Sequence, residues 1–234
     1  MRRFIPVLFL LGGSIFWAFP QAFAAKRPAA SARPAATTQP TTLPVVRQWK
    51  PSAYPTDEVN LVIMGDWGSD GKEQKSAAVQ LANYVEATHK QFYGALLAGD
   101  NFYTKLTGIK DYQWQSLFED MYDARKLAMP FYGALGNHDY EVVAGKPKAQ
   151  TEIEYAAAHP DSRWKMPSRY YRVDFPVEHP IVSVLMLDSN KPKFTPDEWQ
   201  QEIAWIDAQL SDRRGAIWTM ACAHHPLEIG RAHV

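Results

Sequence analysis

Short apolar runs recur between residues 59 and 223, and segments with helical periodicity separate several of them. A run of four to eight apolar residues that stops at a glycine or polar residue is typical of a buried strand, and apolar residues repeating about every 3.6 positions indicate a helix. The pattern predicts strands over 59–64, 93–99, 131–136, 169–175, 181–188 and 216–223, and helices over 73–90, 111–123 and 196–210. Strands that alternate with helices, followed by two adjacent strands, predict a layered α/β fold.

Four of these apolar runs end in polar side chains of a restricted kind, in the segments "IMGDWG", "LLAGDNFY", "GALGNHD" and "MACAHHP". The side chains are carboxylates, a phenol, an amide and imidazoles: Asp66, Asp100, Tyr103, Asn137, His138 and His224. Taken singly, an aspartate after a strand is commonly a turn or helix-capping residue. Four such endings in one chain favour a shared site at one edge of a sheet.

The chemistry of this set favours metal ions. Asp66 and Asp100 would repel each other in one site unless a positive charge lay between them. Carboxylate and phenol oxygens suit a hard ion, whereas amide and imidazole groups suit a borderline divalent ion. The Tyr103 phenol, with an ordinary pKa of about 10, loses its proton at neutral pH only beside a strong Lewis acid, which indicates a trivalent ion such as iron.

Two ions about 3.5–4 Å apart stabilise the attacking and leaving oxygens of an in-line displacement at phosphorus. His138 follows Asn137 in the sequence and is free to protonate a leaving alcohol. We expect Asp139 to set the orientation of the His138 ring.

The motifs "GDWG", "GDNFY" and "GNHD", in this order and followed by "HHP", resemble the purple acid phosphatases, especially the small tartrate-resistant type, within the calcineurin-like metallophosphoesterases. The resemblance covers about residues 59–228, and the tyrosine of "GDNFY" is its discriminating element. It implies a four-layered αββα sandwich and two metal ions, Fe(III) plus a divalent Fe, Zn or Mn.

The resemblance also implies a role for each residue of the set. Asp66 and Tyr103 would bind the ferric ion, and Asp100 would bridge both metals. Asn137 and His224 would bind the divalent ion. His138 would contact the substrate phosphate and the leaving group.

The function expected from these features is that of an exported acid phosphatase acting on small phosphomonoesters. A phosphodiesterase or nucleotidase of the same superfamily, or a non-catalytic exported module that binds a phosphorylated ligand or wall polymer, remains an alternative. The chain has 25 basic and 25 acidic side chains, so its charge does not favour nucleic acid or an acidic membrane as a partner. The sequence does not indicate the oligomeric state.

The first 58 residues predict a signal peptide and a linker. A basic start at Arg2 and Arg3, an apolar stretch and the small-residue site Ala22-Phe23-Ala24 are typical of a signal peptide over 1–24. An uncleaved membrane anchor is the alternative, but it needs about 20 continuous apolar residues. Residues 25–58 are rich in Pro, Ala and Thr and predict a disordered linker. We therefore expect a periplasmic or secreted protein without a membrane anchor after cleavage, and the single cysteine, Cys222, excludes an intrachain disulfide.

The C-terminus departs from the family pattern. Proteins of this family continue to a Gly-His-x-His motif that completes both metal sites, and the chain contains no such motif. The last residues, "IGRAHV", correspond to a common sequencing adapter translated in one frame. We expect residues 229–234 to be non-native and the domain over 59–228 to be truncated, so that this polypeptide binds metal weakly and is nearly inactive.

Overall fold

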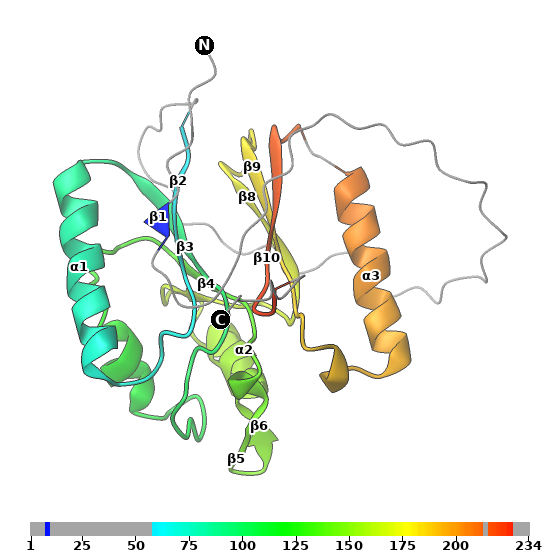
Figure 1. Ribbon diagram of the computed structural model, residues 1–234, viewed down its shortest axis with the longest axis horizontal. Helices are drawn as coiled ribbons and strands as arrows, with labels where there is room; N and C mark the ends of the chain where they lie inside the picture. The colour runs from blue at the N-terminus through cyan, green and yellow to red at the C-terminus, as the bar shows by residue number, and fades with distance from the viewer. Residues whose placement is uncertain (1–7, 10–57, 213–214, 227–234) are drawn as a thin grey trace, which may run out of the picture.

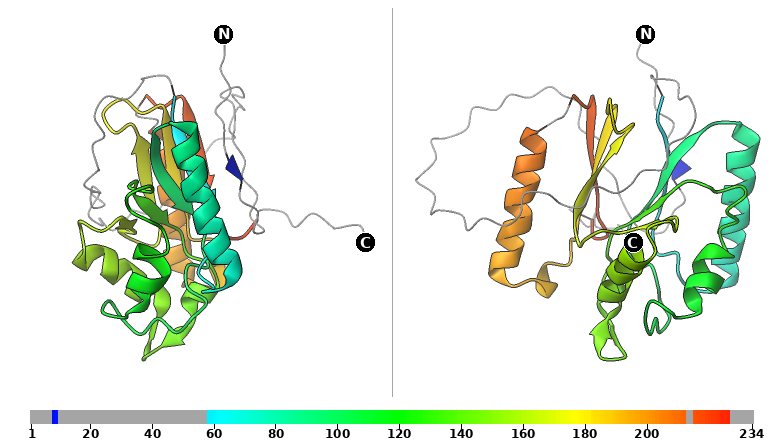
Figure 2. Two further views of the ribbon diagram at one scale, coloured as in Figure 1. Left: turned by 90° about the vertical axis from the view of Figure 1, so that its left-hand side faces the viewer. Right: turned by 180° about the vertical axis from the view of Figure 1, so that it is seen from behind.

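The described residues, 8–9, 58–212 and 215–226 of the computed structural model, form four layers. Helix α1 (Lys72–Thr88) covers one sheet, helix α3 (Pro196–Ser211) lies beside a second sheet, and the two sheets face each other between the helices (Figure 1). The view from behind shows the same order of layers (Figure 2). The predicted αββα sandwich is confirmed.

The first sheet is parallel throughout. Its strands, in spatial order, are β1 (Leu8–Phe9), β2 (Asn60–Met64), β3 (Phe92–Leu97), β4 (Phe131–Gly133) and β7 (Trp164–Lys165). Every residue of β2 and β3 is buried, because layers cover both faces of the sheet. Burial on both faces explains why these strands appear in the sequence as continuous apolar runs rather than as alternating patterns.

The second sheet contains an antiparallel pair and a parallel pair. Strand β8 (Tyr171–Phe175) lies antiparallel to β9 (Val182–Met186), which lies parallel to β10 (Trp218–Cys222). A parallel pair needs a long crossover connection, and α3 supplies it between β9 and β10. Helix α3 begins with a capping box, in which Thr195 and Glu198 satisfy each other's backbone N–H groups.

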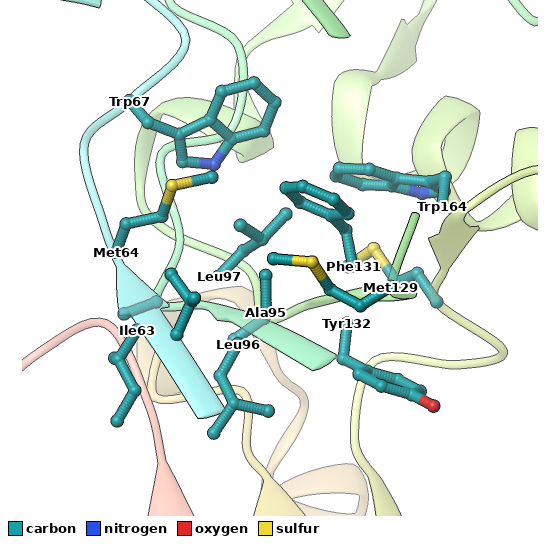
Figure 3. Close-up of a cluster of buried hydrophobic side chains, with 14 of the residues drawn as sticks. Ile63, Met64, Trp67, Ala95, Leu96, Leu97, Met129, Phe131, Tyr132 and Trp164 are labelled. Carbon is teal, nitrogen blue, oxygen red and sulfur yellow. The ribbon is translucent and has the colours of Figure 1, made fainter. Parts of the chain in front are cut away.

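Aromatic side chains join the two sheets. The Phe175 ring lies 5.6 Å from the Tyr132 ring and 6.4 Å from the Tyr93 ring, both in edge-to-face geometry. Figure 3 shows Tyr132 on one side of the first sheet and its neighbour Phe131, together with Trp164, on the other. Successive side chains of a strand point to opposite faces of the sheet. Some core residues therefore lie between the two sheets, and others form an aromatic cluster on the outer face of the first sheet.

The predicted helix over 111–123 is wrong in type and length. The structure has a π-helix, η1 (Trp114–Glu119), followed by turns. Trp114 stacks on Tyr155 at 3.6 Å between ring centroids, and Phe118 packs edge-on against Trp164 at 5.5 Å. The large rings of this segment therefore pack from a short π-helical turn rather than from a regular helix.

The sequence patterns also missed a hairpin and a helix. Strands β5 (Val142–Val143) and β6 (Lys146–Pro147) form a two-residue hairpin, and α2 (Lys148–Ala158) follows at once. Two short 3₁₀ turns, η2 (His138–Tyr140) and η3 (Lys191–Lys193), lie in the connections. The hairpin is too short to show an alternating pattern.

Most of the predicted signal peptide and linker, and all of the predicted non-native tail, lie outside the described residues. Residues 8 and 9 belong to the predicted signal peptide and pair here with Val62 and Ile63 of β2. Within the described part of the chain, no helix has the length and apolar character needed to cross a membrane.

Candidate metal centre

Loops that follow strands of both sheets meet at one place. Asp66 follows β2, Asp100 follows β3 and His224 follows β10, and one ligand atom from each lies within 4.8 Å of the others. Tyr103 is hydrogen-bonded to this group, and Asn137 Oδ1 lies 3.1 Å from Nε2 of His224. The structure therefore brings together all five predicted ligands.

The phenol of Tyr103 lies between the two carboxylates. Its oxygen is 2.8 Å from Asp66 Oδ1 and 2.9 Å from Asp100 Oδ2. Burial, together with hydrogen bonds to both carboxylates, raises the pKa of Tyr103. A phenol donates one proton, so these three oxygens form a concentrated negative site that a cation would stabilise.

The ring of His224 is oriented by the backbone. Its Nδ1 lies 2.9 Å from the carbonyl oxygen of Ala98, and a carbonyl only accepts, so Nδ1 carries the proton. In the neutral imidazole, Nε2 then presents a lone pair, and it lies 3.1 Å from Asn137 Oδ1. Two acceptors that face each other at this distance fit a bound cation, as do the three oxygens around Tyr103.

The backbone at the carboxylates is strained. Asp66 has φ 55° and Asp100 has φ 53°, both in the left-handed region that disfavours residues other than glycine. Close approach of the loops holds Asp100 in place: a Cβ added to Gly136 would lie 2.1 Å from Asp100 Oδ1. Strain of this kind occurs where the surrounding structure fixes a functional residue.

His138 lies at the rim of the cluster. Its backbone N–H donates to Asp100 Oδ1 at 3.0 Å, and its ring lies 4.6 Å from the Tyr103 ring. The expectation that Asp139 orients this ring is wrong, because Nδ1 of His138 lies 2.7 Å from Glu141 Oε1 instead.

Asp139 has a different task. It is fully buried and accepts backbone N–H groups of Asn101 at 2.9 Å, Gly136 at 2.8 Å and Phe102 at 3.3 Å. The side chain of Asn101 in turn donates to Glu152 Oε2 at 3.0 Å. Burial raises the pKa of both Asp139 and Glu152. This network holds the "GDN" and "GNHD" loops together beneath the cluster.

Sequence reasoning missed Asn101, Glu141, Lys148 and Glu152. Asn101 had a signal, since it is part of the "GDNFY" motif. The other three lie in the unpredicted hairpin and helix or beside them, where no pattern pointed to a site.

Comparisons with known proteins agree with this geometry. The sequence profile of the family described as calcineurin-like phosphoesterase matches residues 59–234. Tartrate-resistant acid phosphatase type 5 of Homo sapiens is 31% identical over 194 residues, which cover 74% of this chain and 57% of that protein. Purple acid phosphatase 3 of Arabidopsis thaliana is 36% identical over 108 residues, 45% of this chain and 28% of that protein.

A solved structure shares the fold. It is described as GAP50, the anchor in the inner membrane complex of Plasmodium, with a TM-score of 0.52 and 22% identity over 64% of this chain and 49% of that chain. The chain spans 57% of the length of the human relative. The profile match and the level of identity together establish that the chain belongs to the calcineurin-like phosphoesterase family and has purple acid phosphatases among its homologues.

Proposed function

We propose that the whole protein is an exported acid phosphatase that hydrolyses small phosphomonoesters at a dinuclear metal centre. The observation that carries this proposal is the convergence of Asp66, Asp100 and His224 within 4.8 Å, from loops that are up to 158 positions apart in the sequence numbering. The names of the relatives support an acid phosphatase rather than a binding module.

In this proposal, Asp66 and Tyr103 would hold a ferric ion, Asn137 and His224 would hold a divalent Fe, Zn or Mn, and Asp100 would serve as a ligand to both. This chain would then supply three ligands to each ion, and the remaining positions would be taken by further ligands, substrate and water. Bound ions supply Lewis acidity at the phosphoryl group. A ferric ion would favour the phenolate form of Tyr103, whose proton would pass to solvent, and would so oppose the effect of its two carboxylate neighbours.

His138 supplies the proton for the leaving group. A water oxygen forms the new bond to phosphorus while the bond between phosphorus and the ester oxygen breaks, and His138 passes a proton to that oxygen. The products are an alcohol and inorganic phosphate, and the neutral imidazole regains its proton from solvent. His138 is suited to this because its side chain is 39% exposed at the rim of the cluster.

The test uses protein expressed from the complete gene, loaded with iron and zinc. We expect turnover of a chromogenic phosphomonoester and a visible absorption band that disappears on reduction. Tyr103→Phe should remove the band, because the phenolate that gives it colour is gone, whereas Tyr112→Phe, at a residue 74% exposed, should keep it.

Assays with a phosphodiester and a nucleoside monophosphate, run beside the monoester, distinguish the related enzyme classes. Absence of turnover on all three substrates, in protein that has bound two metal ions, would refute the proposal.

A further inference from the structure

A buried ammonium group lies behind His138. The side chain of Lys148 is 0% exposed, and its Nζ donates to the carbonyl oxygens of Phe102 and Thr104. These two carbonyls belong to the residues on either side of Tyr103. Lysine is almost never fully buried unless it is paired, because removing its charge from water is costly. The partner that offsets this cost is Glu141, whose Oε2 lies 3.0 Å from Nζ.

The hairpin of β5 and β6 places Glu141 opposite Lys148. The backbone N–H of Lys148 donates to the carbonyl oxygen of Glu141 at 3.0 Å, just beyond the strands. At the turn, Ala144 and Gly145 have φ values of 52° and 86°. Positive φ at both central residues is the mark of a type I′ turn, which fixes the register of a two-residue hairpin. The pairing of residues 141 and 148 is therefore set by the backbone.

The two carboxylate oxygens of Glu141 have different partners. Oε2 pairs with Lys148, and Oε1 lies 2.7 Å from Nδ1 of His138. The hydrogen bond from Lys148 is the main cause that lowers the pKa of Glu141, so the carboxylate stays ionised. An ionised carboxylate only accepts hydrogen bonds, so Nδ1 of His138 carries a hydrogen and Nε2 is the nitrogen left for a substrate.

An exposed pair between glutamate and histidine is ordinarily worth little. The Glu141 and His138 side chains are 49% and 39% exposed, and their contact alone would not distinguish a functional pair from a surface one. The difference is the fully buried Lys148, which fixes one oxygen of Glu141 and so restricts where the other can lie. The same ammonium also fixes the backbone around Tyr103.

We propose that Glu141, held by Lys148, is the positioning residue for His138, and that Lys148 couples the orientation of this histidine to the loop that carries Tyr103. This inference rests on the proposed function for the role of His138 as proton donor. It assigns to Glu141 the task that the sequence suggested for Asp139.

The first test does not depend on activity. Selective ¹⁵N-histidine labelling of the full chain reports which imidazole nitrogen carries the hydrogen, and His138→Gln identifies the resonance. At a pH at which the ring is neutral, we expect the Nδ1–H tautomer in the unaltered protein and a mixture of tautomers in Glu141→Ala. Glu154→Ala is the matched control, because Glu154 pairs with Lys146 of the same hairpin rather than with His138.

The second test measures the consequence for catalysis, in metal-loaded protein from the complete gene. A misplaced proton donor lowers the rate of hydrolysis most for substrates with poor leaving groups. Glu141→Ala should therefore lower kcat about tenfold or more for an alkyl phosphate and much less for 4-nitrophenyl phosphate. We expect little change in KM. Glu141→Gln keeps an oxygen that accepts from Nδ1 and should restore part of the loss. Lys148→Met should act in the same direction, and the Glu141 variants supply the answer if Lys148→Met does not fold.

The outcomes separate the two proposals. An unchanged His138 tautomer in Glu141→Ala, or an equal change in Glu154→Ala, would overturn the positioning role. Equal losses of kcat on the alkyl and aryl substrates would overturn it as well. Protein that hydrolyses no phosphate ester but shows the expected tautomer change would refute the phosphatase and retain the positioning of His138.

Discussion

Asp66 and Asp100 have the same unusual backbone conformation, and each follows a buried strand. A left-handed φ costs most residues with a Cβ about 1–2 kcal/mol, and aspartate less than most. Both residues recover this cost through the contacts that surround them, and for Asp100 those contacts depend on the missing side chain of Gly136. The geometry of the cluster is therefore fixed by the backbone before any ligand arrives.

Replacing Gly136 by alanine tests this dependence. The new Cβ would lie 2.1 Å from Asp100 Oδ1 and 2.3 Å from its backbone nitrogen, so the loop has to move. We expect a loss of roughly 1–3 kcal/mol in the free energy of unfolding and at least a tenfold loss in zinc affinity by calorimetry. Gly108→Ala, where no atom lies within 4 Å of the added Cβ, should change neither quantity.

The buried carboxyl group of Glu202 should make the free energy of unfolding depend on pH. Burial raises its pKa from the ordinary 4.5 to about 7, and its Oε2 has no hydrogen-bond partner. The folded state thus favours the protonated carboxyl group of Glu202. Its contribution to the free energy of unfolding is fully present below pH 4.5 and is lost as the pH rises through 7. The loss amounts to up to about 3 kcal/mol. Glu202→Gln should remove this decline and be more stable than the parent at pH 8 by urea unfolding.

Asp207→Asn, at an exposed position of the same helix, should keep the pH dependence of the parent. Equal slopes in Glu202→Gln and the parent between pH 5 and pH 8 would contradict the assignment.

The sequence identified the residues of the cluster better than it identified their supports. Asp66, Asp100, Tyr103, Asn137 and His224 follow apolar strands, and the ends of strands are legible in a sequence. The sequence did not indicate that Glu141, rather than Asp139, contacts the His138 ring. This contact depends on the directions of the Asp139 side chain, within the 3₁₀ turn, and of the Glu141 side chain, directly after it, and the turn leads into a hairpin only six residues long.

At the scale of elements, the turn of this hairpin offers a direct prediction. Ala144 has φ 52° and precedes Gly145. Asparagine tolerates this conformation better than alanine, and Asn-Gly is the preferred type I′ pair. Ala144→Asn should therefore raise the free energy of unfolding by about 1 kcal/mol, measured by urea titration.

Ala144→Val provides the opposite case, because a β-branched side chain is disfavoured at positive φ. We expect it to destabilise the protein. Equal stability of the two variants would show that the turn adopts another conformation in solution.

The difference between the predicted helix over 111–123 and the observed π-helix has a physical reason. Periodicity reports which residues are buried, and Trp114, Leu117 and Phe118 are buried. Periodicity does not report how large rings from distant segments share one space, and here Trp164 and Tyr155 meet Trp114 from elements that come later in the chain.

At the scale of the whole molecule, the layered fold was predictable because strands covered on both faces leave long apolar runs. The order of strands in each sheet was not predictable in this way, since it depends on crossovers such as α3 between two strands of the same sheet. The boundaries of the best-patterned elements, β2, α1 and α3, agree with the sequence to about two residues or better.

Export of the protein is a property of the whole molecule. If residues 1–24 are a signal peptide, the exported protein begins at Ala25, and its mass by intact mass spectrometry should match a chain that starts there. Ala24→Lys should block processing, because the cleavage site requires a small residue. Detection of the uncleaved chain in the membrane fraction of the parent would instead favour an anchor.

His224 comes from the second sheet, whereas the other members of the cluster follow strands of the first. An ion shared between them would bind only while the sandwich is closed, so each gain in its affinity would equally oppose separation of the halves. Removing the ion with a chelator would then abolish catalysis and also weaken the association of the two sheets.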